Sequence, residues 1–505
     1  MIGGLFKSAS RLALVAVAGV MVGGISAQAA DLGGDCCADL EERVAELEAT
    51  TARKGNRKVS LQISGHLHKS IMHWDDGLEQ NTYAGVDNIN ASSRFRFVGD
   101  AKITPKWSAG YLMEMEGFGD MNSHQMHQLS ASGVTTVAPG GSASSQALTT
   151  LNLRHSAWWI ENKDIGRVWV GLTDPAGSGI DGINLGNSNF AANAKVGLNG
   201  GGMALRGSDG GQNAVGSATS APPNMSARTW TGLLHGNNGL MSLSDETRHN
   251  VIKYVSPTLM GFILSAAWGE DDMSDVALRY AGEFSGFKIA AGAVYTKVTD
   301  ASTGNVTGAG GGSTHFSGCA DLAALNLNRN DRDCSSFAVA GSIMHTATGL
   351  FVSSNYGQRT DNNRKALFES TSATNAIDLA LVSSKDTNWG VRGGIEQNFF
   401  GPGKTTLFGE YNQASGTPLA NGGSQLTDAG LNVALTGQTI TSSEISVWGL
   451  GLVQVIDAAA MDLYVAYRNF SADLKSTANT VGAGANTVDG VKDFQIITVG
   501  GVIRF

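Results

Sequence analysis

Apolar and polar side chains alternate in many short segments of the chain after Lys58. In residues 59–64, for example, one face carries Val59, Leu61 and Ile63, and the opposite face carries serine and glutamine. Residues 107–116, 287–296 and 461–468 repeat this period of two. Such a period predicts β-strands with one apolar face and one polar or small face.

Sixteen segments with this character predict an all-β fold. An even number of antiparallel strands lets the first pair with the last, which removes the open sheet edges. A barrel of sixteen strands encloses an aqueous channel, whereas eight strands leave an interior filled by side chains. The predicted strands are 58–73, 92–104, 106–117, 150–161, 166–173, 248–256, 260–270, 274–284, 286–297, 335–346, 349–358, 386–398, 404–415, 442–456, 460–471 and 491–505.

The lengths of the connections favour a membrane barrel over a soluble β-sandwich. Short turns such as Thr104-Pro105, Phe284-Ser285 and Gly401–Gly403 alternate with long connections, apart from one short exception, and the longest covers residues 174–247. Transmembrane barrels have short turns at one end and long loops at the other. We therefore expect residues 58–505 to form a sixteen-stranded antiparallel transmembrane β-barrel.

The N-terminus has the features of an export signal. Lys7 and Arg11 precede the apolar stretch 12–25, and Ala27-Gln28-Ala29 offers a cleavage site of small residues. The apolar stretch is too short for a membrane-spanning helix, which needs about 20 residues. We expect residues 1–29 to be removed as a signal peptide.

A short helix is predicted between the signal and the barrel, within residues 30–57. Apolar or small residues recur every three or four positions over residues 36–53, which is the pattern of a coiled-coil seam. Its centre resembles the Arg-apolar-x-x-apolar-Glu pattern of short trimeric coiled coils, which implies a periplasmic trimerisation helix carried by Leu40, Arg43, Val44, Leu47 and Glu48. A single amphipathic helix is the alternative, because the seam is short.

Composition narrows the possible functions. Charged residues make up 16% of the chain, compared with about 25% in soluble domains. The net charge of −9 argues against binding to nucleic acid, which requires basic surfaces. The chain carries no nucleophile-elbow motif, no zinc-protease motif and no clustered His or Cys spacing. We therefore expect no enzyme, no metal and no cofactor.

The four cysteines are exported to an oxidising compartment if the signal prediction holds. Cys319 and Cys334 lie in one long connection and are candidates for a disulfide that closes a surface loop. Cys36 and Cys37 are adjacent in the chain and could form a vicinal pair or interchain links.

Several segments resemble known outer-membrane proteins. The last strand alternates out to a terminal Phe505, which resembles the signature by which the barrel-assembly machinery recognises its substrates. Residues 154–171 and 250–262 look like strand pairs of general porins. The mature chain as a whole resembles an alphaproteobacterial porin of the general-diffusion superfamily. The resemblance implies a homotrimer in the lipid of the Gram-negative outer membrane that lets small hydrophilic solutes diffuse passively.

The same resemblance implies a loop that folds into the barrel and narrows it. We assign this constriction to residues 174–247, which include Asp174 and Asp181. Alternation places Phe95 and Phe97 toward lipid and a set of charged side chains on the polar face, namely Arg94, Arg96, Glu114, Glu116 and Arg154. An acidic loop facing arginines would weight ions electrostatically, while ordinary lumen polarity is the alternative.

Two other functions remain open at this point. A tethering barrel, held by a trimeric N-terminal coiled coil, would need only the barrel and the helix. A substrate-selective porin would have the same fold with a specific binding site. The ion preference and pore size depend on how residues 174–247 fold, which periodicity does not predict.

Overall fold

The computed structural model describes residues 59–117, 122–124, 126, 151–206, 230–233, 248–269, 273–299, 319, 333–371, 379–418, 439–477, 485–487 and 491–505. The predicted signal peptide, the predicted helix at 36–53 with its trimerisation residues, and Cys36 and Cys37 lie outside these residues. The chain divides into two compact units, Met1–Arg53 and Lys54–Phe505. The second unit holds all the described elements.

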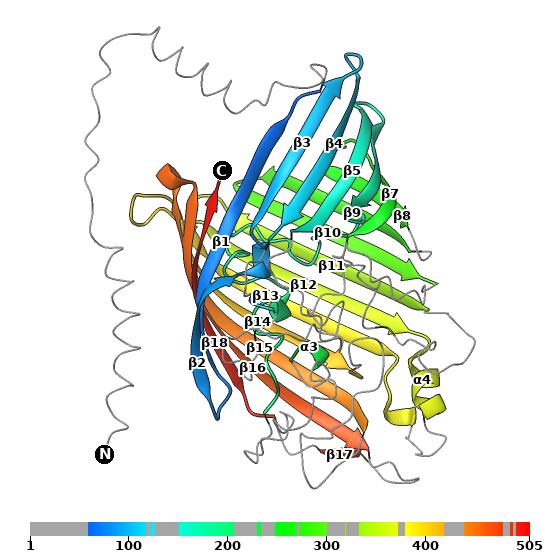
Figure 1. The fold of residues 1–505 in the computed structure, drawn as a ribbon, viewed down its shortest axis with the longest axis vertical. Coiled ribbons are helices and arrows are strands. Elements are labelled where there is room, and N and C mark those ends of the chain that lie inside the picture. The colour runs from blue at the N-terminus through cyan, green and yellow to red at the C-terminus, as the bar shows by residue number, and fades with distance from the viewer. Residues whose placement is uncertain are drawn as a thin grey trace. The chain divides into compact units, whose positions relative to one another are not determined.

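The described residues form one closed antiparallel sheet of 18 strands (Figure 1). β2 (Gln80–Asp87) and the three-residue β17 (Ala485–Thr487) only extend neighbouring strands, so the wall has sixteen positions. The wall strands are β1 (Gln62–Asp75), β3 (Arg94–Lys102), β4 (Trp107–Glu116), β5 (Asn152–Asn162), β6 (Gly166–Thr173), β7 (His249–Val255), β8 (Phe262–Gly269), β9 (Ser274–Phe284), β10 (Phe287–Val298), β11 (Cys334–His345), β12 (Leu350–Asp361), β13 (Lys385–Gln397), β14 (Thr405–Gly416), β15 (Thr439–Ile456), β16 (Met461–Thr477) and β18 (Phe494–Arg504). The predicted sixteen-stranded barrel is confirmed.

The barrel closes between its first and last strands. β1 pairs with β18 from His66 opposite Arg504 to Asp75 opposite Gln495. At the end of the chain, Gly65 and Phe505 exchange both backbone hydrogen bonds, at 2.9 and 3.1 Å. The terminal residue is therefore part of the wall, and no sheet edge is left open at this seam.

Turn chemistry explains one of the short connections. β9 and β10 are joined by Ser285 and Gly286, whose φ angles are 50° and 81°. Positive φ at both central residues defines the hairpin turn whose twist matches that of the two strands. The longer connections carry short helices in places, such as α4 (Arg364–Thr371) between β12 and β13. Within the described ranges, no helix has the length and apolar character needed to cross a membrane.

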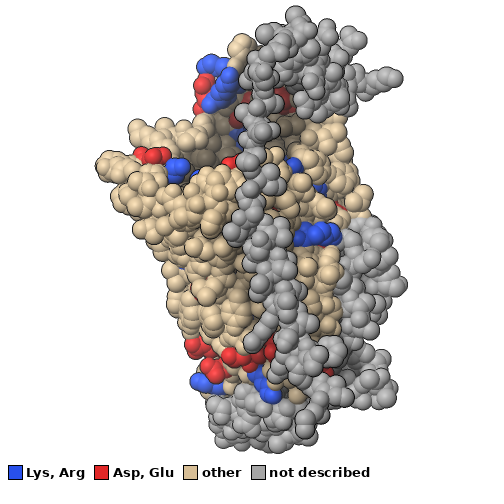
Figure 2. Space-filling model, turned by 90° about the vertical axis from the view of Figure 1, so that its left-hand side faces the viewer, with Lys and Arg blue, Asp and Glu red and all other residues tan. Residues whose placement is uncertain are grey.

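The outer face of the wall is an apolar band. Large apolar side chains on it are exposed, and Figure 2 shows few charged side chains over the middle of the wall. Soluble proteins rarely expose a contiguous apolar surface of this extent. Members of the band include Ile71, Trp158, Ile252, Leu264, Trp268, Val276, Leu278, Val352, Tyr356 and Leu450.

One strand position of the wall is interrupted. β2 pairs with residues 69–75 of β1, and β3 pairs with residues 62–66 along the same edge (Figure 1). β2 and β3 are thus two halves of one wall position, separated by residues 88–93.

The predicted disulfide is present between Cys319 and Cys334, with a Cα–Cα distance of 6.4 Å.

Candidate functional site

Charged side chains gather on the inner face of β3, β4 and β5. Glu114 has no exposed surface and lies under three guanidinium groups. Arg154 donates from Nε to Oε1 at 2.7 Å, Arg96 donates from Nε to Oε2 at 2.7 Å, and Arg94 donates from Nη1 to Oε1 at 3.3 Å. Arg154 also pairs with Glu116. The structure thus brings together five of the predicted site residues, which we call the arginine cluster: Arg94, Arg96, Glu114, Glu116 and Arg154.

A β-bulge in β5 completes this arrangement. Glu114 lies opposite His155 and Met115 lies opposite Leu153, so Arg154 is an extra residue in the pairing. A bulge interrupts the alternation of side chains between the two faces, so two consecutive side chains can approach the same residue of the partner strand. Arg154 and His155 consequently both reach Glu114, with His155 Nε2 at 3.9 Å from Oε1.

Asp174 and Arg248 border the cluster. The Asp174 carboxylate lies 3.8 Å from His155 Nε2, and its backbone oxygen accepts a hydrogen bond from Lys253 Nζ at 2.6 Å. Burial and the neighbouring Arg154 lower the pKa of Arg248. Counting Arg248 and Asp174 with the cluster gives four guanidinium groups and three carboxylates. These seven groups together carry a net charge of +1, whereas the whole chain carries −9.

Residues 174–206 fold against the inside of the wall, and we call them the inward segment. Near its start, Arg279 of β9 donates to the backbone oxygens of Ala176 at 2.7 Å and Ser178 at 2.6 Å. Farther along, Arg468 of β16 donates to the backbone oxygen of Asn193 at 2.5 Å. The segment therefore runs from the β9 side of the interior to the β16 side.

Apolar contacts fill the space between the inward segment and this part of the wall. Ala176 and Ile180 pack with inward alanines and valines of β7 to β11. Ala191 and Ala192 pack with Phe351, Phe408, Tyr464 and their neighbours. Small residues on the polar face of the strands leave the volume that the segment occupies. This side of the barrel interior is packed, and the arginine cluster lies on different strands.

Glu410 of β14 connects two of the residues that hold the inward segment. It accepts hydrogen bonds from Arg392 and Arg468, each at 2.6 Å, and is almost completely buried. Arg392 also donates to Asn189 Oδ1 at 3.1 Å. The sequence analysis did not single out Arg279, Arg392 or Glu410. The sequence could have pointed to them, because each is a charged residue at an inward position of a predicted strand.

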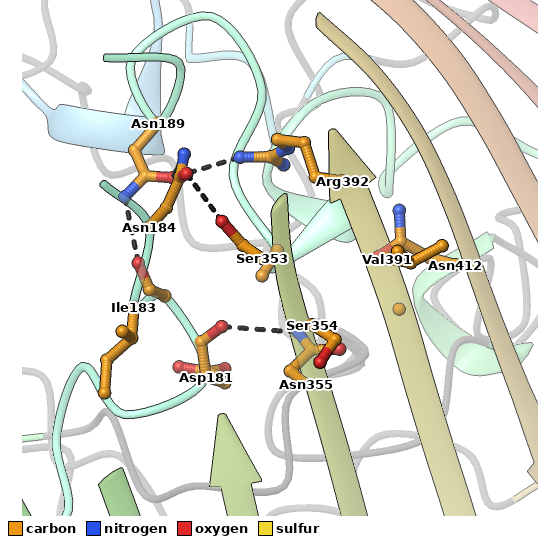
Figure 3. A pocket seen from close by; sticks show the side chains of 13 residues that line it. Asp181, Ile183, Asn184, Asn189, Ser353, Ser354, Asn355, Val391, Arg392 and Asn412 are labelled. Carbon is orange, nitrogen blue, oxygen red and sulfur yellow. Dashed lines mark hydrogen bonds between the residues drawn. The ribbon is translucent and has the colours of Figure 1, made fainter. Parts of the chain in front are cut away.

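Asp181 is not brought to the arginine cluster. It is 7% exposed and lines a small polar cavity of about 20 Å³ between the inward segment and β12 to β14 (Figure 3). Asn355 of β12 donates to its backbone oxygen at 3.3 Å, and Ser353 donates to Asn184 Oδ1 at 2.8 Å across the same cavity. Of the two predicted loop carboxylates, only Asp174 lies near the arginines.

Among the described residues, no group of three or more His, Cys, Asp or Glu side chains is placed to hold a metal ion.

No protein-family model and no curated protein matches the chain.

Three solved structures illustrate what the chain is similar to. The anion-selective porin from Comamonas acidovorans is 12% identical, with 88% of this chain and 100% of that chain covered at a TM-score of 0.45. The trimer form of OmpT from Vibrio cholerae is 13% identical, with 89% and 100% covered at 0.42. Salmonella typhi OmpF in complex with daunomycin is 12% identical, with 89% and 98% covered at 0.43. At this level of similarity, the function has to be argued from the residues of this chain.

Proposed function

We propose that the protein is an outer-membrane porin that lets small hydrophilic solutes and ions diffuse passively through a water-filled channel. The observation that carries the proposal is a closed wall of sixteen strand positions with an apolar outer band and a charged inner cluster. An apolar outer band suits lipid, and a barrel of this size leaves room for water inside. Membrane-spanning barrels with long loops are typical of the Gram-negative outer membrane.

In this proposal, solutes pass between the inward segment and the arginine cluster. The segment is hydrogen-bonded to β9, β12, β13 and β16, which leaves the side facing β3 to β5 for the solute path. Arg96 supports this placement, because its side chain is 44% exposed although it binds the fully buried Glu114. A local excess of one positive charge predicts a weak preference for anions. Passive diffusion requires no catalytic residue.

Electrical recording of the purified protein in planar bilayers tests the proposal. We expect open channels with an ohmic current, and a reversal potential in a KCl gradient that indicates weak anion preference. Swelling of proteoliposomes should fall smoothly with the size of neutral sugars. Saturation of flux by one solute class would favour a substrate-selective porin instead. A folded barrel without any conductance would favour the tethering barrel.

We further propose that the protein is a homotrimer. Lys69 on the outer face supports a protein contact there: it alternates with the exposed Leu67 and Ile71, and its Nζ lies 3.1 Å from the carboxylate of the buried Asp87. A lysine facing lipid near the bilayer centre costs about 2–4 kcal/mol, whereas a neighbouring subunit can cover the exposed part of Lys69. The pattern from Arg43 to Glu48 supports three chains. The alphaproteobacterial origin rests on the sequence resemblance alone.

A further inference from the structure

Residues 88–93 leave the wall in the middle of a strand position. β2 ends at Asp87 and β3 begins at Arg94, and the residues between them form the short turn η1 (Ile89–Ala91) and its flanks. Asn88, Ser92 and Ser93 are buried, while the three residues of η1 are partly exposed. An interruption inside a strand costs ladder hydrogen bonds, and other contacts must replace them.

We call residues 88–93 the excursion. Its first four residues are fixed to the wall beside it. Asn88 donates from Nδ2 to the Tyr464 hydroxyl at 2.7 Å, and the same hydroxyl lies 2.7 Å from His68 Nε2. His66 and His68 each place a ring nitrogen near the backbone oxygen of Ala91, at 3.2 and 3.0 Å. Inward side chains of β1 and β16 therefore supply partners for the excursion.

The excursion also contacts the inward segment. Asn90 donates from Nδ2 to the backbone oxygen of Phe190 at 3.1 Å. A second connection runs through Ser123, whose Oγ accepts from the Ile89 backbone at 3.0 Å and donates to the Leu198 backbone oxygen at 2.7 Å. Two separate hydrogen-bonded routes thus join residues 88–93 to the inward segment.

The other end of the excursion meets the arginine cluster through Ser92. Its hydroxyl donates to Glu116 Oε2 at 2.7 Å and accepts from Arg94 Nη2 at 3.1 Å. Its backbone oxygen accepts from Arg94 Nε at 2.8 Å. Residues 88–93 are therefore bonded both to the inward segment and to the cluster that faces it.

We infer that residues 88–93 are a second constriction element, which borders the narrowest section of the channel and contributes to its ion selectivity. The inference rests on the proposed function. It extends that function, because the perimeter of the narrow section then consists of the inward segment, the excursion and the arginine cluster. The partly exposed η1 is the portion that faces passing ions.

Charged thiol reagents test this inference, because the sign of the attached charge predicts the direction in which the reversal potential shifts. In a background with Cys36→Ser and Cys37→Ser, single cysteines are placed in η1 by Ile89→Cys and Ala91→Cys. Ala347→Cys in the exposed turn between β11 and β12 is the control, because it offers the same reactive group to water at the end of the barrel wall, away from residues 88–93. Each open channel is treated with a sulfonate-bearing or an ammonium-bearing methanethiosulfonate while current is recorded, and modification is verified by mass spectrometry.

At one or both η1 positions, the sulfonate reagent should shift the reversal potential toward cations, and the ammonium reagent should shift it toward anions. Both reagents should lower the unit conductance, and the control should respond to neither. Conducting channels that stay unchanged at both η1 positions, or whose η1 cysteines do not react, would overturn the inference and leave the porin proposal intact. A background protein that folds but does not conduct would overturn the porin proposal itself.

Discussion

Glu114 is the residue at which the electrostatics of the channel can be tested most directly. It is fully buried and accepts hydrogen bonds from three arginines, so it neutralises guanidinium charge that the channel would otherwise display. Glu114→Gln keeps the size of the side chain and one acceptor oxygen, replaces the other oxygen with an amide donor, and removes one negative charge. The local balance of four guanidinium groups and three carboxylates then becomes four against two. We expect the channel to become more selective for anions.

The magnitude follows from Coulomb interaction in a wet lumen. An ion about 7 Å from the carboxylate, at a dielectric constant of about 80, interacts with it by roughly 0.6 kcal/mol. This energy is close to thermal energy, so the local occupancy changes about threefold for each sign of ion, and the anion-to-cation ratio rises about eightfold. Screening acts over about 10 Å at 0.1 M salt and about 3 Å at 1 M. The shift should therefore shrink at high salt.

Asp181→Asn is the matched control, because it also removes one carboxylate from the barrel interior. Asp181 belongs to the inward segment and is buried against β12 and β13, so its substitution should leave the reversal potential nearly unchanged. The converse change, Arg94→Gln with Arg96→Gln, should shift the selectivity toward cations. Equal shifts for Glu114→Gln and Asp181→Asn, or no shift in a folded and conducting Glu114→Gln channel, would refute the proposed solute path.

Three further predictions concern stability and assembly. Arg364 of α4 is fully buried between Asp386 and Asp361, which raise its pKa despite burial. Arg364→Ala removes the buried cation that these two carboxylates share, while Asp386 keeps its ion pair with Arg359, and should cost about 3 kcal/mol in unfolding measurements. The substitution Lys365→Ala at the exposed neighbour should be neutral. Lys69→Met leaves Asp87 without its cation and should lower the temperature at which the proposed trimer dissociates on gels, whereas Lys106→Met, which breaks an exposed pair, should not. Replacing Cys319 and Cys334 by serine should lower the free energy of unfolding by about 3 kcal/mol in the chain-entropy model, and an unchanged value would mean that the crosslink constrains little.

Strand positions could be predicted because the wall imposes a local pattern. Each strand separates an apolar outer face from a small or polar inner face, so a period of two is visible within about eight residues. The predicted segments 166–173 and 274–284 coincide with β6 and β9, and the ends of the others differ from those of the observed strands by up to six residues. β2 was missed because residues 80–87 are mostly small or polar and show little alternation.

The composition of the arginine cluster could be predicted, but its connectivity could not. Alternation placed Arg94, Arg96, Arg154 and Glu114 on one face. It could not predict that Glu114 lies beneath all three arginines, because cross-strand register and the bulge at Arg154 depend on pairing between segments that are distant in the chain. A pattern of single residues therefore suggested an exposed basic wall, whereas the structure has a largely neutralised one.

The path of the inward segment was beyond prediction for a different reason. Residues 174–206 lack periodicity, and their position is specified by side chains that come from the wall. Arg279 and Arg468 donate to backbone oxygens of the segment, so the segment needs few charges of its own to be held. This division of roles explains why a loop with few charged residues can be fixed inside a barrel. Ion selectivity therefore depends mainly on the residues that the segment faces, which are those of β3 to β5 and of the excursion at 88–93.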